Sequence, residues 1–311
     1  MASNYPADMP LADYFADVYR PLKMLGKSAH TIRLYLQTLA RFKDFLGREP
    51  TLEDLNDAAV CNFLQHRITQ GRAAHTVDKE RDKIIALANY AAKKRHIGEF
   101  IDIPTLNPPS AAPQCWKQEH VSALLAACEK MTGTVAGNDA RHWWTAFHYV
   151  VLYTGERTGA VMSLKWEWLD MATGWLRVPG EFRKGGKKAM TYRLPQCVLD
   201  KLRLIELPKR DLIFAVHWKK SYMTGSFYLH YGKLLRIAGL PDSRKFKPQC
   251  LRRTFASFLE AAGGDATRAL AHSSRKVTET SYLDETVIDR IPSSEVLGKV
   301  LQLPGFVART V

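Results

Sequence analysis

The sequence lacks the features of a membrane-spanning, secreted or disulfide-stabilised protein. No apolar run approaches the roughly 18 residues that a spanning helix needs, and the best one covers only residues 121–128. The opening MASNYPADMP has neither a basic nor an apolar segment, so no secretion signal is expected. The five cysteines are scattered and never spaced as CxxC, which argues against a disulfide framework or a zinc site. These absences favour a cytoplasmic protein that does not contact a membrane.

Acidic residues are in clear deficit. The 311-residue chain has 45 Lys and Arg against 31 Asp and Glu, which gives a net charge of +14. Its 46% hydrophobic and 24% charged residues are otherwise typical of a globular protein. Such a positive surplus attracts a polyanion, and nucleic acid is the favoured partner because no membrane segment is present. At roughly 150 residues per domain, the length predicts two domains.

The clearest internal boundary is a proline-rich stretch over residues 98–114. Pro104, Pro108, Pro109 and Pro113 fall within ten residues of one another. A helix cannot continue through such a stretch, and proline-rich chain favours an extended spacer. We therefore predict a first domain over residues 1–97, a linker over 98–114 and a second domain over 115–311.

The first domain is predicted to be a small helical module. One helix is capped by Ser28 and stopped by Gly47, a second runs over 57–70, and a third begins near Thr76. Each carries apolar residues at helical spacing. The three apolar stripes contain Ile32, Tyr35, Leu36, Leu39, Phe42 and Leu46, then Val60, Phe63, Leu64 and Ile68, then Val77, Ile84, Ile85, Leu87 and Ala91.

The second domain alternates helices with two short strands. The strands, over 175–179 and 190–195, flank Gly185-Gly186 and predict a hairpin. The predicted fold class is therefore mainly α with a small antiparallel β-sheet. Helices are expected over 117–130, 141–153, 160–166, 197–205, 223–238, 250–262 and 294–303.

Basic residues are concentrated in two windows. Residues 183–193 and 244–253 each hold five basic residues and no acid. Such runs are often solvated surface, but the first lies on a tight hairpin and the second leads straight into an apolar helix, where backbone donors can add phosphate contacts. The third helix of the first domain also has a basic face, either solvated or contacting DNA. The predicted DNA-binding residues are Lys79, Arg81, Lys83, Arg183, Lys187, Lys188, Arg244, Lys245, Lys247 and Arg253.

Several short motifs occur in a fixed order through the second domain. His272 precedes Tyr282 by ten residues, and Leu164-Lys-Trp166 follows the first arginine motif. The motifs are Tyr153-Thr-Gly-Glu-Arg157, the hairpin lysine Lys184, Gln249-Cys-Leu-Arg252-Arg-Thr-Phe, Leu270-Ala-His272-Ser-Ser and Thr278-Glu-Thr-Ser-Tyr282. Together they resemble those of the tyrosine recombinase (phage integrase) family, and the resemblance covers almost the whole chain.

The resemblance implies a fold and an assembly. The first domain corresponds to the family's helical core-binding (SAM-like) domain and the second to its catalytic domain, and the two clamp double-stranded DNA between them. Strand exchange between two duplexes implies a homotetramer on two DNA sites, while a monomer in solution and an accessory DNA-bending protein stay open. An apolar stripe on the last helix, after Pro292, can dock on a neighbour or on its own domain.

The resemblance also implies a catalytic set with a role for each member. Arg157 and Arg252 clamp the scissile phosphate, with Gln249 and His272 as further donors. Tyr282 attacks the phosphate to give a 3′-phosphotyrosyl intermediate, and Lys184 protonates the leaving 5′ oxygen. Because one phosphoester replaces another, no ATP or metal is required. The sequence accordingly has no GxxxxGK[ST] loop and no carboxylate cluster with metal-ligand spacing.

Two positions depart from the family pattern. Gln249 stands where the family usually has a histidine, and glutamine can donate a hydrogen bond but cannot take a proton. Ala160 stands where an acid usually buttresses the first arginine. We therefore expect a site-specific recombinase with altered rather than absent activity. Two alternatives remain, a type IB topoisomerase-like nicking-closing enzyme and a catalytically silent DNA-binding regulator.

Overall fold

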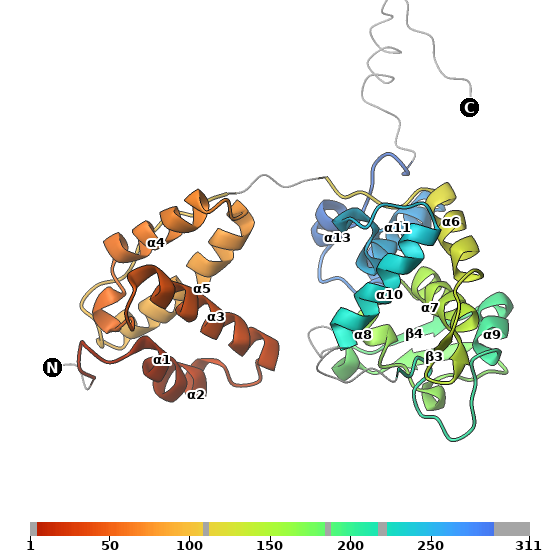
Figure 1. Cartoon of the computed structure of the whole chain (residues 1–311), viewed down its shortest axis with the longest axis horizontal. Coiled ribbons are helices and arrows are strands. Elements are labelled where there is room, and N and C mark those ends of the chain that lie inside the picture. The colour runs from red at the N-terminus through yellow and green to blue at the C-terminus, as the bar shows by residue number, and fades with distance from the viewer. Residues whose placement is uncertain (1–4, 108–111, 184–187, 217–222, 289–311) are drawn as a thin grey trace, which may run out of the picture. The chain divides into compact units, whose positions relative to one another are not determined.

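The computed structural model describes residues 5–107, 112–183, 188–216 and 223–288. The chain divides into two compact units, residues 1–110 and 111–311. Both are built mainly of helices, and the mainly α fold class with small antiparallel sheets is confirmed (Figure 1).

The N-terminal unit is a bundle of helices without strands in its described part. Its first helical run was not predicted from the sequence and contains a π-helical stretch, η1. The other helices match the three predicted ones. In order, the elements are α1 (Leu11–Asp13), η1 (Tyr14–Tyr19), α2 (Arg20–Lys23), α3 (Ala29–Leu46), the 3-10 turn η2 (Leu52–Asp54), α4 (Asp57–Thr69) and α5 (Ala74–Lys93).

Capping residues set the bounds of α3 and α4. The Ser28 hydroxyl accepts a hydrogen bond from the Thr31 amide, and Gly47 ends the helix in the left-handed conformation at φ 70°. Asn56 caps α4 in the same way as Ser28 caps α3. Two predicted core residues are instead exposed, Leu36 at 45% and Ile68 at 38%. The first half of α3 is only partly covered by its neighbours, and Ile68 lies in the last turn of α4.

The chain after α5 packs back onto the N-terminal unit. Ile101 and Ile103 are buried in its core. The side chain of Arg81 holds this segment by donating from Nε to the Ile103 carbonyl, 2.8 Å away. Over its described residues this proline-containing stretch forms neither helix nor strand. Its alternating residues Ile101 and Ile103 are nevertheless buried, as they would be in a core strand.

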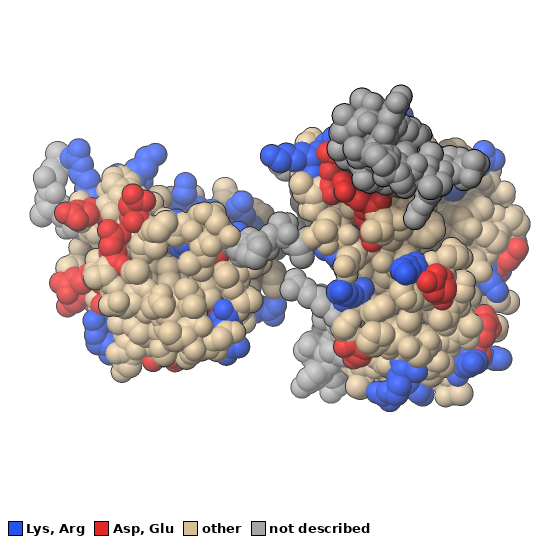
Figure 2. All heavy atoms as spheres, turned by 90° about the horizontal axis from the view of Figure 1, so that it is seen from above, with Lys and Arg blue, Asp and Glu red and all other residues tan. Residues whose placement is uncertain are grey.

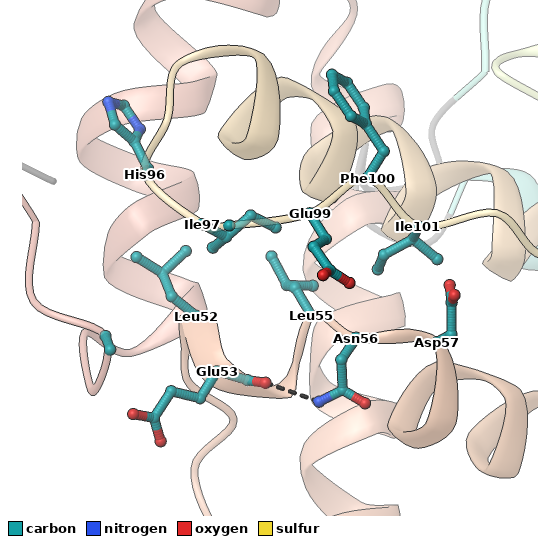
Figure 3. Close-up of a pocket in the computed structure, with 12 residues that line it drawn as sticks. Leu52, Glu53, Leu55, Asn56, Asp57, His96, Ile97, Glu99, Phe100 and Ile101 are labelled. Atoms are coloured by element: carbon teal, nitrogen blue, oxygen red, sulfur yellow. Dashed lines mark hydrogen bonds between the residues drawn. The ribbon is translucent and has the colours of Figure 1, made fainter. Parts of the chain in front are cut away.

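A pocket of about 500 Å³ lies in the N-terminal unit between this segment and the start of α4 (Figure 3). Its apolar wall includes Leu52, Leu55 and Ile97, and its rim carries the carboxylates of Glu53 and Glu99. These acidic groups disfavour a phosphate at this rim.

The C-terminal unit is larger and contains both short sheets. Its elements are α6 (Gln118–Cys128), β1 (Thr134–Val135), β2 (Asn138–Asp139), α7 (Ala140–Thr154), α8 (Thr158–Val161), η3 (Trp166–Trp168), β3 (Trp175–Val178), η4 (Gly180–Phe182), β4 (Met190–Arg193), α9 (Gln196–Arg203), α10 (Met223–Ile237), η5 (Arg244–Phe246), α11 (Pro248–Ala261), α12 (Ala266–Ala269) and α13 (Arg275–Ser281).

Most predicted elements of this unit are present. The predicted hairpin is confirmed, with β3 antiparallel to β4 and Trp175 opposite Arg193. The helix predicted over 160–166 is wrong, because α8 already ends at Val161. Beyond it the backbone pairs with a distant segment, since the Ile213 amide donates to the Leu164 carbonyl at 2.9 Å. The helix predicted over 294–303 lies outside the described residues.

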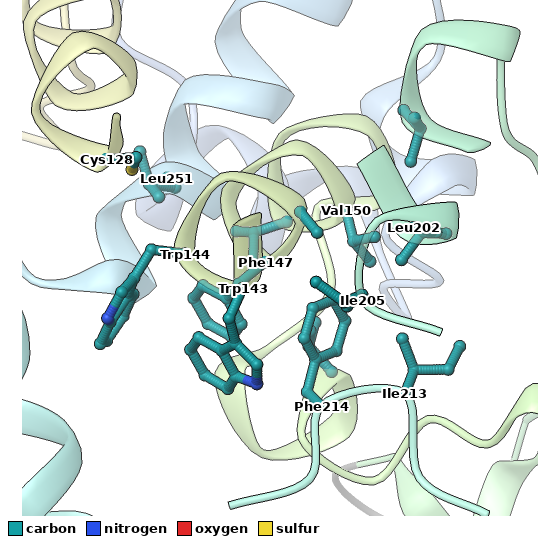
Figure 4. Close-up of a cluster of buried hydrophobic side chains, with 14 of the residues drawn as sticks. Cys128, Trp143, Trp144, Phe147, Val150, Leu202, Ile205, Ile213, Phe214 and Leu251 are labelled. Atoms are coloured by element: carbon teal, nitrogen blue, oxygen red, sulfur yellow. The ribbon is translucent and has the colours of Figure 1, made fainter. Parts of the chain in front are cut away.

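Helix α7 forms the centre of the C-terminal core. Trp143, Trp144 and Phe147 are fully buried and pack among side chains from α6, α9, α11 and the segment around Phe214 (Figure 4). The helix therefore holds a fixed position between α9 and α11. Gly155 and Glu156, which follow its C-terminus, are buried as well.

Candidate active site

The end of α7 forms a tight turn that only glycine fits. Gly155 caps the helix at φ 61°, a conformation that other residues rarely adopt. A Cβ atom added there would lie 2.3 Å from Cδ1 of Phe255 and 2.9 Å from Cδ2 of Leu270. The turn leads through Glu156 into Arg157, which is the N-terminal cap of α8 and half-buried.

Arg252 crosses the unit interior from α11 to this turn. Its side chain is fully buried. Nη1 donates to the Gly155 carbonyl at 2.6 Å, and Nη2 donates to the Leu270 carbonyl at 3.1 Å. Among the described residues, Nε has no hydrogen-bond partner. The two Nη atoms therefore hold the guanidinium in place, while its buried Nε makes no hydrogen bond to the described part of the chain.

His272 is held in a defined tautomer. Its Nε2 lies 3.2 Å from Nη2 of Arg252, which can only donate, so Nε2 accepts. Nδ1 then carries the proton and donates to the Thr278 hydroxyl at 2.9 Å. Burial, followed by the charges of Arg252 and Arg157, lowers the pKa of His272 to about 4. The imidazole is therefore neutral at pH 7.

Tyr282 follows α13 and faces the same cluster. Its ring centroid is 4.4 Å from that of His272 and 5.4 Å from Cζ of Arg252. Burial raises the pKa of the phenol, but Arg252 and Arg157 outweigh it through charge and hydrogen bonding, so the pKa lies below its ordinary value. The tyrosine backbone is tied to α11, because the Ser257 hydroxyl donates to the Tyr282 carbonyl at 3.2 Å.

The structure therefore brings four of the six predicted catalytic residues into one cluster. These four are Arg157, Arg252, His272 and Tyr282. Gln249 is exposed in the first turn of α11, three residues before Arg252, and so lies on the same side of that helix. Lys184 lies outside the described residues, as does Lys187.

The predicted DNA-binding residues fall into three groups. Lys188 and Lys245 are exposed and Arg253 is half-buried. Lys79 is paired with Asp82, and Lys247 with Asp242. Three residues already use donors within the protein, and their contact with DNA stays a prediction. Arg81 bonds Ile103, Lys83 donates to the Lys79 carbonyl, and Arg183 is buried against Glu156; of Arg244 only the backbone in η5 is described.

Sequence reasoning missed Glu156. This carboxylate is only 2% exposed and accepts hydrogen bonds from Arg183 and Tyr192. The sequence contained one signal for this residue. Glu156 is an acid that directly precedes Arg157, in a set of motifs that is otherwise basic.

The described residues carry charges of both signs and no cluster of metal-binding side chains. On the faces seen in Figure 2, Lys and Arg lie among Asp and Glu on a mostly uncharged surface. No group of three or more His, Cys, Asp or Glu side chains there could hold a metal ion. None of the helices in the described ranges has the length and apolar character to cross a membrane.

Comparison with known proteins identifies similar chains over most of this length. The sequence model described as the phage integrase family matches residues 115–287. Tyrosine recombinase XerC of Thermodesulfovibrio yellowstonii is 23% identical over 271 residues, covering 82% of this chain and 85% of that protein. A lambda integrase dimer bound to a COC′ core site has a TM-score of 0.68 at 18% identity, covering 91% of this chain and 80% of that one. A lambda integrase tetramer bound to a Holliday junction gives 0.66 at 17% identity, with coverages of 86% and 78%.

Proposed function

The chain belongs to the phage integrase family, and from that premise we propose that it is a site-specific recombinase acting through a 3′-phosphotyrosyl intermediate. One observation carries the proposal. Three distant segments of the chain bring together Arg157, Arg252 and Tyr282. These side chains form one partly buried cluster with the neutral His272.

Charge stabilisation is the first task of such a site. A phosphodiester is anionic, and attack on phosphorus spreads further charge over its non-bridging oxygens. Arginine suits this task because it is always protonated and presents a planar fork of donors. The guanidiniums of the buried Arg252 and the half-buried Arg157 are the groups that we assign to the phosphate.

Activation of the nucleophile is the second task. Ionising an ordinary tyrosine at pH 7 costs about 4 kcal/mol, because its pKa is about 10. The two guanidiniums lower that cost by lowering the pKa of Tyr282. Tyr282 loses its proton to solvent, and the phenolate oxygen then bonds to phosphorus. The bond from phosphorus to the 5′ oxygen breaks, and that oxygen takes a proton. We assign this proton to Lys184, which directly follows Arg183 in the sequence.

DNA is the partner that this chemistry requires. We propose that four protomers assemble on two duplex sites, in line with the related lambda integrase tetramer on a Holliday junction. We further propose that the protein works on DNA in the cytoplasm. A net charge of +14 supports affinity for the phosphate backbone.

A suicide substrate tests the proposal directly. A nicked duplex that loses its leaving strand should trap a covalent adduct, and peptide mapping should find it on Tyr282. Tyr282→Phe should abolish the adduct while DNA binding is retained. An adduct that persists in this variant would assign the nucleophile to another residue, and wild-type protein that binds DNA without any adduct would support the silent regulator.

Two further measurements separate the remaining alternatives. Cleavage should continue in EDTA, and a strict requirement for Mg²⁺ would contradict the mechanism. Sequencing the trapped DNA ends should reveal a preferred site. Relaxation of supercoiled DNA by a monomer without site preference would instead favour the topoisomerase-like enzyme.

A further inference from the structure

A buried carboxylate connects the turn bearing Arg157 to the hairpin of the C-terminal unit. Glu156 is only 2% exposed and lies directly before Arg157 in the chain. Its Oε2 accepts a hydrogen bond from the Arg157 backbone amide at 3.3 Å. A buried carboxylate is costly unless its oxygens are paired, so the other partners of Glu156 matter.

Those partners come from both sides of residues 184–187. The Nε of Arg183 donates to Oε1 of Glu156 at 2.5 Å, and the hydroxyl of Tyr192 on β4 donates to the same oxygen at 2.6 Å. Arg183 also reaches across to the other flank, since its Nη1 donates to the Lys188 carbonyl at 3.0 Å. The Glu156 carboxylate therefore binds a side chain before this four-residue segment, that of Arg183, and one on the strand beyond it, that of Tyr192. The backbone directly after the segment is held through Arg183.

We propose that Glu156 is a positioning residue for the strand-cleavage step. It fixes the two flanks of the hairpin against the Arg157 turn and so sets where the residue after Arg183 can act. This inference rests on the proposed function, in which that next residue, Lys184, protonates the leaving oxygen. Glu156 touches neither the phosphate nor the nucleophile in this role.

The chemistry of the cluster requires a carboxylate at position 156. All three partners donate to Glu156, and an ionised carboxylate only accepts. A glutamine would turn an amide NH₂ group toward at least one of these donors. Ala160, three residues after Arg157, is buried and uncharged, and the acid next to Arg157 in this chain is Glu156.

The test compares two leaving groups in wild type and Glu156→Gln. One duplex has the natural 5′ oxygen at the scissile position, and the other has a bridging 5′ sulfur. A thiol has a pKa near 8.5, so the thiolate leaves without a proton. We expect Glu156→Gln to cleave the oxygen substrate at least roughly 10-fold more slowly than wild type and the sulfur substrate at nearly the wild-type rate, since general acids contribute about 10²- to 10⁴-fold.

A second buried glutamate supplies the matched control. Glu80 in the N-terminal unit is 1% exposed and pairs with Arg67 and Arg41, so Glu80→Gln also breaks a buried ion pair. It should keep the wild-type ratio of oxygen to sulfur cleavage rates. Thermal unfolding of both variants, followed by circular dichroism, verifies that the compared samples are folded.

The outcomes separate this inference from the proposed function. An equal defect of Glu156→Gln on both substrates would overturn the positioning role and leave Glu156 as a structural residue. An unchanged rate on the oxygen substrate would also overturn it. If wild-type protein forms no tyrosyl adduct with either substrate, the proposed function itself fails.

Discussion

The guanidinium of Arg252 donates a 2.6 Å hydrogen bond to the carbonyl of Gly155, 97 residues earlier in the chain. This contact joins the second arginine motif to the turn that carries the first. Because the same guanidinium also contacts His272, the relative positions of three motifs depend on one buried side chain. The site is therefore sensitive to small changes around the Gly155 turn.

Gly155→Ala should destabilise the C-terminal unit strongly. The left-handed conformation costs a non-glycine residue about 1–2 kcal/mol. The new methyl group would also meet Phe255 at 2.3 Å, and overpacking adds about 1–3 kcal/mol. Urea unfolding followed by tryptophan fluorescence can measure the loss, because all seven tryptophans lie after residue 110.

Gly263→Ala is the control, with φ 80° and open space around a Cβ, and should lose only about 1 kcal/mol. Equal losses would mean that the turn has room for a side chain.

Arg252→Lys should reduce cleavage while preserving charge. An ammonium is a single point and cannot contact Gly155, Leu270 and the phosphate together, as the planar fork can. Losing one preorganised donor typically costs about 10²–10³ in rate, and we expect that loss here. Single-turnover cleavage of the suicide substrate measures it, with Arg268→Lys on the exposed side of α12 as the control. A variant that retains the wild-type rate would remove Arg252 from the phosphate clamp.

The pH dependence of cleavage should follow Tyr282 and not His272. The pKa of His272 is about 4, so this group is already neutral throughout the range from pH 5.5 to 8. Tyr282, whose pKa lies below the ordinary value of 10.0, gains phenolate as the pH rises. The single-turnover rate should therefore rise with pH without an inflection near 6.5. A break there that disappears in His272→Gln would show that the histidine titrates during the reaction.

Acid should destabilise the C-terminal unit through His148. Complete burial lowers the pKa of this histidine to about 4, against about 6.5 in the unfolded chain. Between these values the unfolded state binds more protons, so stability falls as the pH falls from about 6.5 to 4. From pH 7 to pH 5 the loss attributable to His148 is about 2 kcal/mol.

His148→Leu should remove that part of the pH dependence. The measurement is the free energy of urea unfolding at pH 7 and pH 5, by tryptophan fluorescence. His142→Leu removes a histidine from the same helix but leaves His148 in place, and should keep the wild-type difference between the two pH values. If His148→Leu keeps it as well, the acid sensitivity arises elsewhere.

Local sequence signals determined most of the secondary structure. Ser28 and Gly47 delimit α3 because a cap and a left-handed residue act within one helical turn. The β3–β4 hairpin followed from two strand-like runs around adjacent glycines. The prediction over 160–166 was wrong because the backbone of Leu164 bonds to Ile213, a partner that no local pattern reveals.

The motif order likewise indicated the family and the residues Arg157, Arg252, His272 and Tyr282, since spacing along the chain is visible in the sequence. Only the tertiary structure decided how these side chains are charged and held. Burial together with two neighbouring guanidiniums sets the pKa values of His272 and Tyr282. The tertiary structure also decided that Arg183 pairs with Glu156, because a buried charge needs an opposite charge nearby and the fold places these two residues together.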